Sequence, residues 1–294
     1  AGQPAEMAVL AMGKFGGREM NYHSDLDLVF LYEADGQTAH KNNSDRAETT
    51  SNQHFFSQLA QRIIKTTGRL SAHGRLYEID ARLRPTGKSG ALATSLEQFA
   101  RYFASGEGRL WERQALTKGR VVVGSARIAK KTERVVARAA FGQPWRASDA
   151  HEIRQMRHRL EETASGENLK RGPGGIVDIE FLVQMLQLQH ARRSPPIRIP
   201  NTLAALAALH QEGHLAGEDF QCFTASYRFL RTLEGRLRLV SLVARDKLPS
   251  DPTGSAKLAH LMRCPSSEAL MVDFERHTRQ TRQRFDRIFD AEGR

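Results

Sequence analysis

Residues 13–32, GKFGGREMNYHSDLDLVFLY, carry a glycine-rich turn, two aspartates and an apolar run, in that order. The run from Leu26 to Tyr32 is rich in β-branched and aromatic residues, and this composition predicts a buried strand. Side chains at positions i and i+2 of a strand point to the same face, so we expect Asp25 and Asp27 to project into one small volume. Two carboxylates this close repel each other unless a cation lies between them, and Mg²⁺ is a natural choice for oxygen ligands.

The residues just before these aspartates are candidates for phosphate binding. Gly16 and Gly17 let the backbone pass close to a ligand and turn its amides toward an anion. Lys14 and Arg18 stand beside these glycines, and Ser24 directly precedes the first aspartate. We therefore expect these five residues to contact the phosphates of a nucleotide. A cap or turn role explains Ser24 equally well.

A later charged segment supplies a third carboxylate. The alternation of polar and apolar residues over 76–85 predicts a strand that Pro85 ends. Its polar face carries Glu78, Asp80, Arg82 and Arg84. Charges on a core strand are unfavourable unless they face a polar site, so the pattern indicates that this face looks into one.

Three carboxylates on two neighbouring strands have the layout of a two-metal site. Two Mg²⁺ ions held by Asp25, Asp27 and Asp80 clamp the attacking and leaving oxygens of an in-line displacement. Arg82 and Arg84 are then placed to neutralise phosphate oxygens. The alternative is structural: the two aspartates cap a turn in solvent, and the arginines pair with carboxylates of their own strand.

The remaining pattern predicts an α+β protein. We expect a mixed sheet with strands at 7–12, 26–32, 76–85 and 121–123, and helices at 51–67, 95–103 and 108–116. Ser95 with Gln98 forms a capping box for the second of these helices. After Gly124 the chain turns all-helical. We therefore divide it into a mixed α/β domain over 1–125, a connecting segment over 126–150 and a helical bundle over 151–294.

Composition narrows the classes of function. The chain has 294 residues, a formal net charge of +11 and 7% aromatic residues. No apolar run approaches the length of a membrane span, and the two cysteines lack metal-ligand spacing, so we expect a cytoplasmic protein without membrane association. The positive charge suits nucleic acid, ATP phosphates, an acidic protein or simply a solvated surface. Few aromatics and no RNA-binding motif argue against nucleic acid. Because the sequence lacks an initiator Met, we expect a segment of a longer protein.

The turn, the Asp-x-Asp strand and the later aspartate resemble the nucleotidyltransferase superfamily of DNA polymerase β. A closer resemblance is to the glutamine synthetase adenylyltransferase family. It is carried in order by 13–19 (GKFGGRE), 24–28 (SDLDL), 77–85 (YEIDARLRP), 111–116 (WERQAL) and 174–181 (GGIVDIEF). One difference is Arg18, which stands where many members of the superfamily have a serine.

The resemblance implies Mg²⁺-dependent transfer of AMP from ATP to a tyrosine of glutamine synthetase. It makes residues 1–125 the nucleotidyltransferase catalytic domain, and Asp25, Asp27 and Asp80 the metal-binding carboxylates. It also implies a PII-type signal protein as a partner of the full-length enzyme. The enzymes of that family have two related halves. The sequence of residues 77–85, and residues 274–289, which resemble a natural carboxy terminus, favour the carboxy-terminal, adenylylating half. Phosphorolytic removal of AMP, and an inactive regulatory module, are the alternatives.

Two further acidic groups have structural as well as functional interpretations. Asp178 near a helix start suits capping, while Glu180 suits an ion pair or contact with a substrate loop. Trp111 and Glu112 suit packing with a buried pair better than catalysis.

Overall fold

The computed structural model describes residues 4–38, 49–70, 72, 74, 77–164, 167–240 and 246–292. The chain forms two compact units. The first contains the residues up to Met20 and Ser24–Gln143, and the second contains Asn21–His23 and everything from Pro144 onward. The expected connecting segment at 126–150 differs from this division, because α5 (Ala126–Phe141) belongs to the first unit.

The first unit is built on a mixed sheet, as predicted, but the sheet has five strands where the sequence predicted four. β1 (Met7–Ala11) pairs antiparallel with β2 (Leu26–Tyr32) and with β5 (Arg120–Val123). β3 (Ile79–Asp80) and β4 (Ala93–Ser95) both run parallel to β2, one beside its first residues and the other beside its last. The two short strands therefore share one edge of β2.

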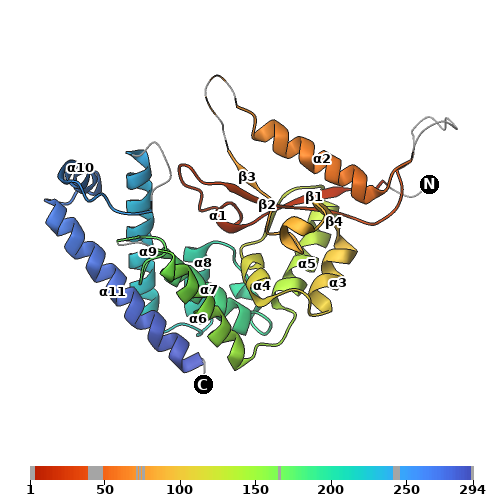
Figure 1. Ribbon diagram of the computed structural model, residues 1–294. Helices are drawn as coiled ribbons and strands as arrows, with labels where there is room; N and C mark the ends of the chain where they lie inside the picture. The colour runs from red at the N-terminus through yellow and green to blue at the C-terminus, as the bar shows by residue number, and fades with distance from the viewer. Residues whose placement is uncertain are drawn as a thin grey trace. The chain divides into compact units, whose positions relative to one another are not determined.

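Helices cover both faces of the sheet, which Figure 1 shows. On one side lies α2 (Asn52–Thr67), whose first turn is capped by the Ser51 hydroxyl. Phe56 of this helix stacks on Tyr32 at 5.0 Å between ring centroids. On the other side lie α3 (Leu96–Ala104), α4 (Leu110–Leu116) and α5. The predicted Ser95 cap of α3 is confirmed, since its hydroxyl accepts the Gln98 amide at 3.2 Å.

The predicted strand over 76–85 is wrong beyond its centre. Only Ile79 and Asp80 pair as strand, and the chain then turns, with the Gly87 amide donating to the Arg84 carbonyl at 2.9 Å. Thr86 takes a φ of +58° in this turn. Residues 75 and 76 lie outside the described part. Because the chain leaves the sheet after Asp80, Arg82 and Arg84 do not share a strand face with it.

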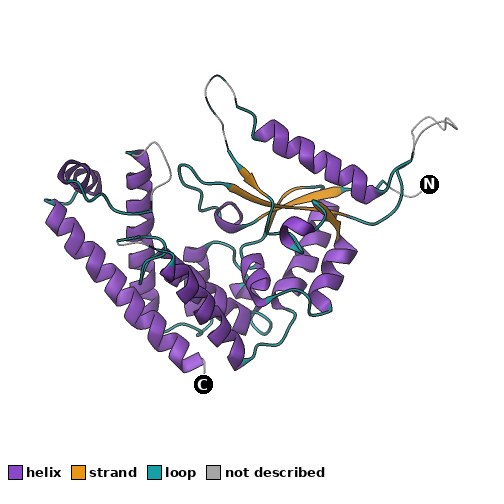
Figure 2. Cartoon of the chain, in the orientation of Figure 1, coloured by secondary structure: helices purple, strands orange, loops and turns teal. Residues whose placement is uncertain are grey.

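The second unit is helical, as predicted (Figure 2). Its helices are α6 (Ala147–Glu162), α7 (Ile176–His190), α8 (Thr202–Gln211), α9 (Gly217–Leu239), α10 (Pro252–Met262) and α11 (Ser267–Glu292). Arg157 of α6 and Asp178 of α7 form an ion pair with no exposure of either side chain. Asp178 also accepts the Gly174 amide at 2.7 Å, so the start of α7 is fixed to α6.

The segment Asn21–His23 is attached to α9. The Asn21 side chain donates to Glu234 at 3.3 Å, and Arg238 donates to the Tyr22 carbonyl at 2.8 Å. Glu234 is fully buried and also pairs with Arg238. These contacts explain why three residues from the amino-terminal motif group with the helical unit.

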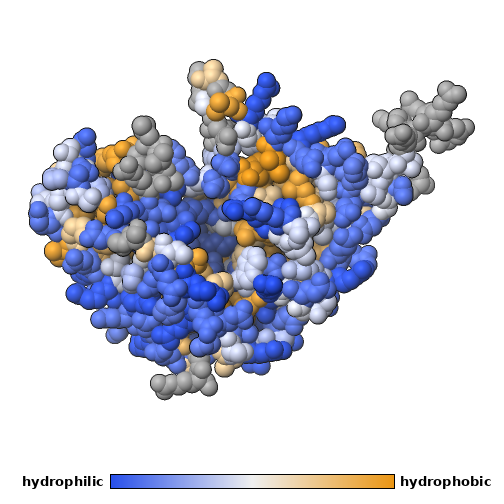
Figure 3. All heavy atoms as spheres, viewed as in Figure 1, coloured by the Kyte–Doolittle hydropathy of each residue, from blue (hydrophilic) through white to orange (hydrophobic). Residues whose placement is uncertain are grey.

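The exterior in the view of Figure 3 is dominated by hydrophilic side chains. This agrees with 44 Lys and Arg and 33 Asp and Glu residues in the sequence. Searching the described helices for a stretch both long and apolar enough to cross a bilayer finds none.

Candidate active site

Gly13 sets the geometry at the start of the glycine-rich turn. It opens α1 (Gly13–Gly16) with a φ of +51°, a value that favours glycine. A Cβ on this residue would lie 2.3 Å from Oδ2 of Asp27. The backbone here is tied to the same residue, since the Met12 amide donates to the Asp27 carbonyl at 2.8 Å. The Asp27 carboxylate therefore occupies space that only glycine leaves open.

Gly16 packs tightly within the turn, and Gly17 follows it directly. A Cβ on Gly16 would lie 1.9 Å from the Lys118 carbonyl oxygen. The Gly16 amide donates to Met12 O at 2.8 Å and the Gly17 amide to Gly13 O at 3.1 Å. Both amides thus donate to carbonyls inside the turn, and the missing side chain of Gly16 lets the backbone at Lys118 approach closely.

Arg120, the first residue of β5, and Lys118, two residues before it, hold this turn, and neither was predicted as a site residue. Arg120 donates to the carbonyls of Gly16 at 2.9 Å and Phe15 at 2.8 Å, and its guanidinium lies over the Phe15 ring. Lys118 forms a buried ion pair with Glu19. Their only signal in the sequence is that two basic residues, separated by one residue, lead into a run of three valines.

Lys14 and Arg18 belong to the same turn. Lys14 is half-buried within α1. Arg18 is exposed and adopts a φ of +57°. Ser24 is buried just before the strand. Of the predicted phosphate contacts, Arg18 therefore presents the most accessible charge in the turn.

The parallel pairing of β2 with β3 places Asp27 opposite Asp80. Their neighbours Leu26 and Ile79 are also opposite each other, and both pack against the apolar core beneath α2. Because side chains alternate along a strand, Asp27 and Asp80 point to the other face. Asp25 lies one residue before β2 and is exposed.

Arg82 contacts the carboxylate of Asp80. Its Nε donates to both oxygens of Asp80, at 2.9 and 2.8 Å, and its Nη2 forms an ion pair with the same group. These hydrogen bonds raise the pKa of Arg82, and the charges of Asp27 and Asp25 act in the same direction. Hydrogen bonding from Arg82 also lowers the pKa of Asp80.

Arg84 has a different role. Its guanidinium donates to the carbonyls of Ala81 at 2.5 Å, Gly90 at 3.2 Å and Lys88 at 3.4 Å. Burial lowers the pKa of this side chain. Arg84 therefore holds the turn that follows β3, whereas Arg82 faces the carboxylates.

The carboxylates of Asp25, Asp27 and Asp80 fit a divalent cation by their chemistry. Within the described ranges, no three Asp, Glu, His or Cys side chains are arranged to hold a metal ion. Both Asp80 oxygens are turned to Arg82 instead. Carboxylate oxygens are the ligands that Mg²⁺ prefers, and a guanidinium held in the field of three carboxylates marks a place that favours positive charge.

The other acidic residues singled out in the sequence have structural partners. Glu112 is buried, accepts the Arg109 amide at 2.9 Å and accepts the Tyr102 hydroxyl. Asp178 lies in the first turn of α7, where it accepts the Gly174 amide and pairs with Arg157, as described above. Glu180 accepts the Tyr227 hydroxyl at 3.2 Å.

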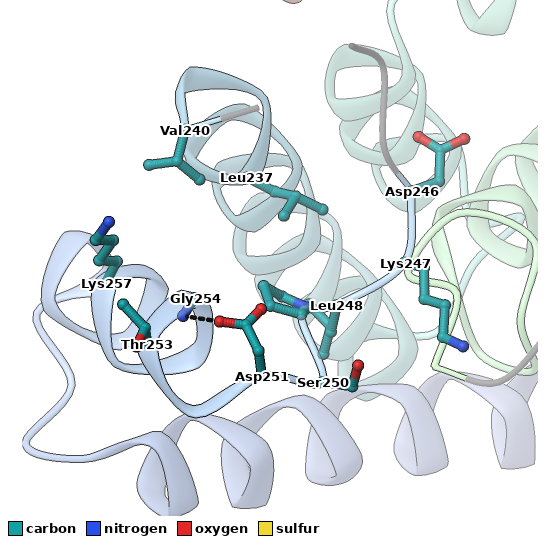
Figure 4. Close-up of a pocket in the computed structure, with 11 residues that line it drawn as sticks. Leu237, Val240, Asp246, Lys247, Leu248, Ser250, Asp251, Thr253, Gly254 and Lys257 are labelled. Atoms are coloured by element: carbon teal, nitrogen blue, oxygen red, sulfur yellow. Dashed lines mark hydrogen bonds between the residues drawn. The ribbon is translucent and has the colours of Figure 1, made fainter. Parts of the chain in front are cut away.

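A separate pocket lies in the second unit, between the end of α9 and the start of α10 (Figure 4). Its volume is about 550 Å³. Asp251 uses its carboxylate to cap α10 by accepting the Gly254 amide at 2.6 Å. Lys247 and Lys257 extend in different directions and do not converge on one point. None of the predicted site residues lines this pocket.

Comparison with known proteins matches the two parts of the chain to two families. Residues 1–135 match the family described as glutamate-ammonia ligase adenylyltransferase, and residues 146–290 match GlnD PII-uridylyltransferase.

Whole-chain relatives are named bifunctional glutamine synthetase adenylyltransferase/adenylyl-removing enzyme. Those from Ralstonia nicotianae and Burkholderia mallei are 32% and 33% identical over 98% of this chain, which covers 32% of each relative. The relative from Nitrosomonas europaea is 32% identical over 99% of the chain, which covers 31% of it. The chain thus spans about a third of the length of these relatives. It belongs to the glutamine synthetase adenylyltransferase family, to which its amino-terminal motifs already pointed.

Proposed function

We propose that this chain is a nucleotidyltransferase that moves AMP from ATP to a tyrosine hydroxyl of glutamine synthetase in the cytoplasm. The observation that carries the proposal is the register of β2 and β3, which sets Asp27 beside Asp80 on one face. The names of the relatives support the substrate, because each names glutamine synthetase.

In this proposal the residues of the first unit bind either the metal ions or the phosphates. Asp25, Asp27 and Asp80 hold the divalent cation, for which we propose two Mg²⁺ ions. When bound, Mg²⁺ supplies positive charge to the triphosphate and favours the ionised form of the tyrosine hydroxyl. Arg82 and Arg18 bind phosphate oxygens.

The transfer itself needs positioning more than covalent help from the protein. The tyrosine oxygen forms a bond to the α-phosphorus, the bond from that phosphorus to pyrophosphate breaks, and the hydroxyl proton passes to solvent. Lys14, Gly16, Gly17 and Ser24 shape the turn beside the carboxylates. Arg84 contributes by fixing the turn after β3.

The test is incubation of the chain with labelled ATP, Mg²⁺ and glutamine synthetase, followed by peptide mapping. We expect label on one tyrosine, and we expect Asp27→Asn and Asp80→Asn to abolish transfer while leaving the fold intact. Asp273→Asn is the matched control, because Asp273 is a surface residue of α11 paired with Arg276. Transfer by the Asp27 variant at the parental rate would refute the metal assignment.

The reverse activity is a second candidate, because the relatives carry both activities in their name. Phosphate attacks the AMP–tyrosine bond in that reaction, releasing ADP and restoring the hydroxyl. Incubation with adenylylated glutamine synthetase and phosphate distinguishes the two: ADP release assigns the chain to removal, and label transfer from ATP assigns it to addition.

We also propose that a PII-type signal protein regulates the full-length enzyme. The match of residues 146–290 to a family named for PII uridylylation supports this proposal. Addition of a purified PII protein to the full-length enzyme should change its rate of AMP transfer, and an unchanged rate would contradict the proposal.

A further inference from the structure

The two arginines after β3 differ in how firmly they are held. The Arg84 guanidinium is fixed by three backbone carbonyls. The Arg82 side chain is 64% exposed, and its hydrogen bonds go to Asp80. Of the two, Arg82 is therefore the one that can move without disturbing the backbone.

Asp80, in contrast, is held in place. Its backbone pairs with β2, and its side chain is only 18% exposed. The Arg82 amide also donates to Oδ1 of Asp80 at 2.9 Å, which fixes the carboxylate near its own chain. A change in the pair thus moves the arginine and leaves the carboxylate in place.

We propose that Arg82 is an exchangeable counter-ion, which holds Asp80 until a divalent cation binds there and then turns to the phosphates of the nucleotide. This inference rests on the proposed function, since it uses the same carboxylates as metal ligands. It goes beyond that function by giving Arg82 two partners in succession, first the Asp80 carboxylate and then the phosphates of the nucleotide.

Electrostatics requires such an exchange. A guanidinium and a divalent cation repel each other, and both need the oxygens of Asp80. Once the cation neutralises the carboxylates, the fork of the arginine loses its partner, and a phosphate group offers the same bidentate geometry. The triphosphate carries negative charge into the site together with the cation, so arginine release and nucleotide binding favour each other.

The exchange predicts that one substitution has opposite effects on two ligands. Arg82→Gln should strengthen binding of Mn²⁺ alone by about tenfold, the scale of one charge-assisted pair. The same variant should weaken binding of Mn²⁺–ATP by about tenfold. Free Mn²⁺ is measured by electron paramagnetic resonance and nucleotide binding by calorimetry, so neither readout depends on catalysis.

Three further variants make the test specific. Lys88→Gln removes a cation whose charge reaches Asp80 without a direct hydrogen bond, so we expect a change in Mn²⁺ affinity of about twofold. Arg82→Lys keeps the positive charge but loses the planar guanidinium that binds a carboxylate through two hydrogen bonds. Its Mn²⁺ affinity should therefore lie between those of the parent and of Arg82→Gln. Asp27→Asn should abolish the Mn²⁺ binding and so locate it. Because Arg82 is exposed, unfolding temperatures should stay close to the parental value.

The outcomes separate this inference from the proposed function. Tighter Mn²⁺ binding by Arg82→Gln, beyond the effect of Lys88→Gln, supports the exchange. Parental Mn²⁺ binding that depends on Asp27 and is unchanged or weakened by Arg82→Gln overturns the exchange alone. No Mn²⁺ binding by either the parent or the Arg82 variant overturns the metal site and the exchange together.

Discussion

Replacement of Gly13 by alanine tests whether the glycine turn sets the position of a catalytic carboxylate. The new Cβ would lie 2.3 Å from Oδ2 of Asp27, whereas ordinary contacts begin at 3.4 Å. The carboxylate must therefore move by about 1 Å, a displacement that typically lowers rate by about 100-fold. The φ of +51° adds a backbone penalty of about 1–2 kcal/mol for alanine.

Two measurements separate these effects. The backbone penalty should lower the unfolding temperature of the first unit by about 3–6 °C. The displacement should lower both AMP transfer and Mn²⁺ affinity. Gly106 provides the matched control, since it has a φ of +88° and no heavy atom lies within 4 Å of the point that a Cβ would occupy. Gly106→Ala should lose stability but keep parental Mn²⁺ affinity and transfer. A Gly13→Ala protein with parental values for both would refute the reasoning.

Three further predictions concern stability. Lys118→Met leaves Glu19 buried without its ion pair, so the free energy of unfolding of the first unit should fall by about 3 kcal/mol in a urea titration. Asp178→Asn removes the buried partner of Arg157, and the second unit should lose a similar amount, seen as an earlier transition in the same titration. Burial raises the pKa of Asp35, but three side-chain hydrogen bonds outweigh this and leave it below its usual value. A lowered pKa stabilises the fold above about pH 4 and loses that contribution as pH falls further. In thermal melts from pH 7 to 3, the unfolding temperature of Asp35→Asn should therefore fall slightly less steeply below about pH 4 than that of the parent. An equally steep fall would contradict this.

The local sequence pattern was sufficient to predict elements that have an uninterrupted apolar run or a clear helical spacing of apolar residues. The apolar run of β2 and the helical spacing of α2 gave those elements with bounds close to the observed ones. β3 was predicted too long because alternation continues past Asp80, while the pairing that makes a strand lasts only two residues. β4 was missed because its three residues carry no pattern of their own and become a strand only beside β2.

The residue types of the candidate site could be predicted, but their partners could not. Alternation predicted that Asp25 and Asp27 share one strand face and that Asp80 lies on the polar face of a neighbouring strand. The register of β2 and β3 is what sets Asp27 beside Asp80. Arg82 and Arg84 look equivalent in the sequence. Only the turn after Asp80 gives one of them carbonyl partners and the other a carboxylate.

The motif over residues 13–32 shows most clearly what cannot be predicted from the sequence. Residues 13–32 read as one continuous nucleotide-binding element, yet Asn21–His23 group with the helical unit. The reason is a buried carboxylate more than 200 positions away, Glu234, which accepts from Asn21, while Arg238 holds the Tyr22 carbonyl. A local sequence pattern cannot identify a partner so far away in the chain. A glutamate in a helical sequence is expected to lie on the surface, and only the fold shows that Glu234 is buried. A motif quoted as contiguous sequence therefore identifies the chemistry of a site, while the residues that fix its shape have to be found in the fold.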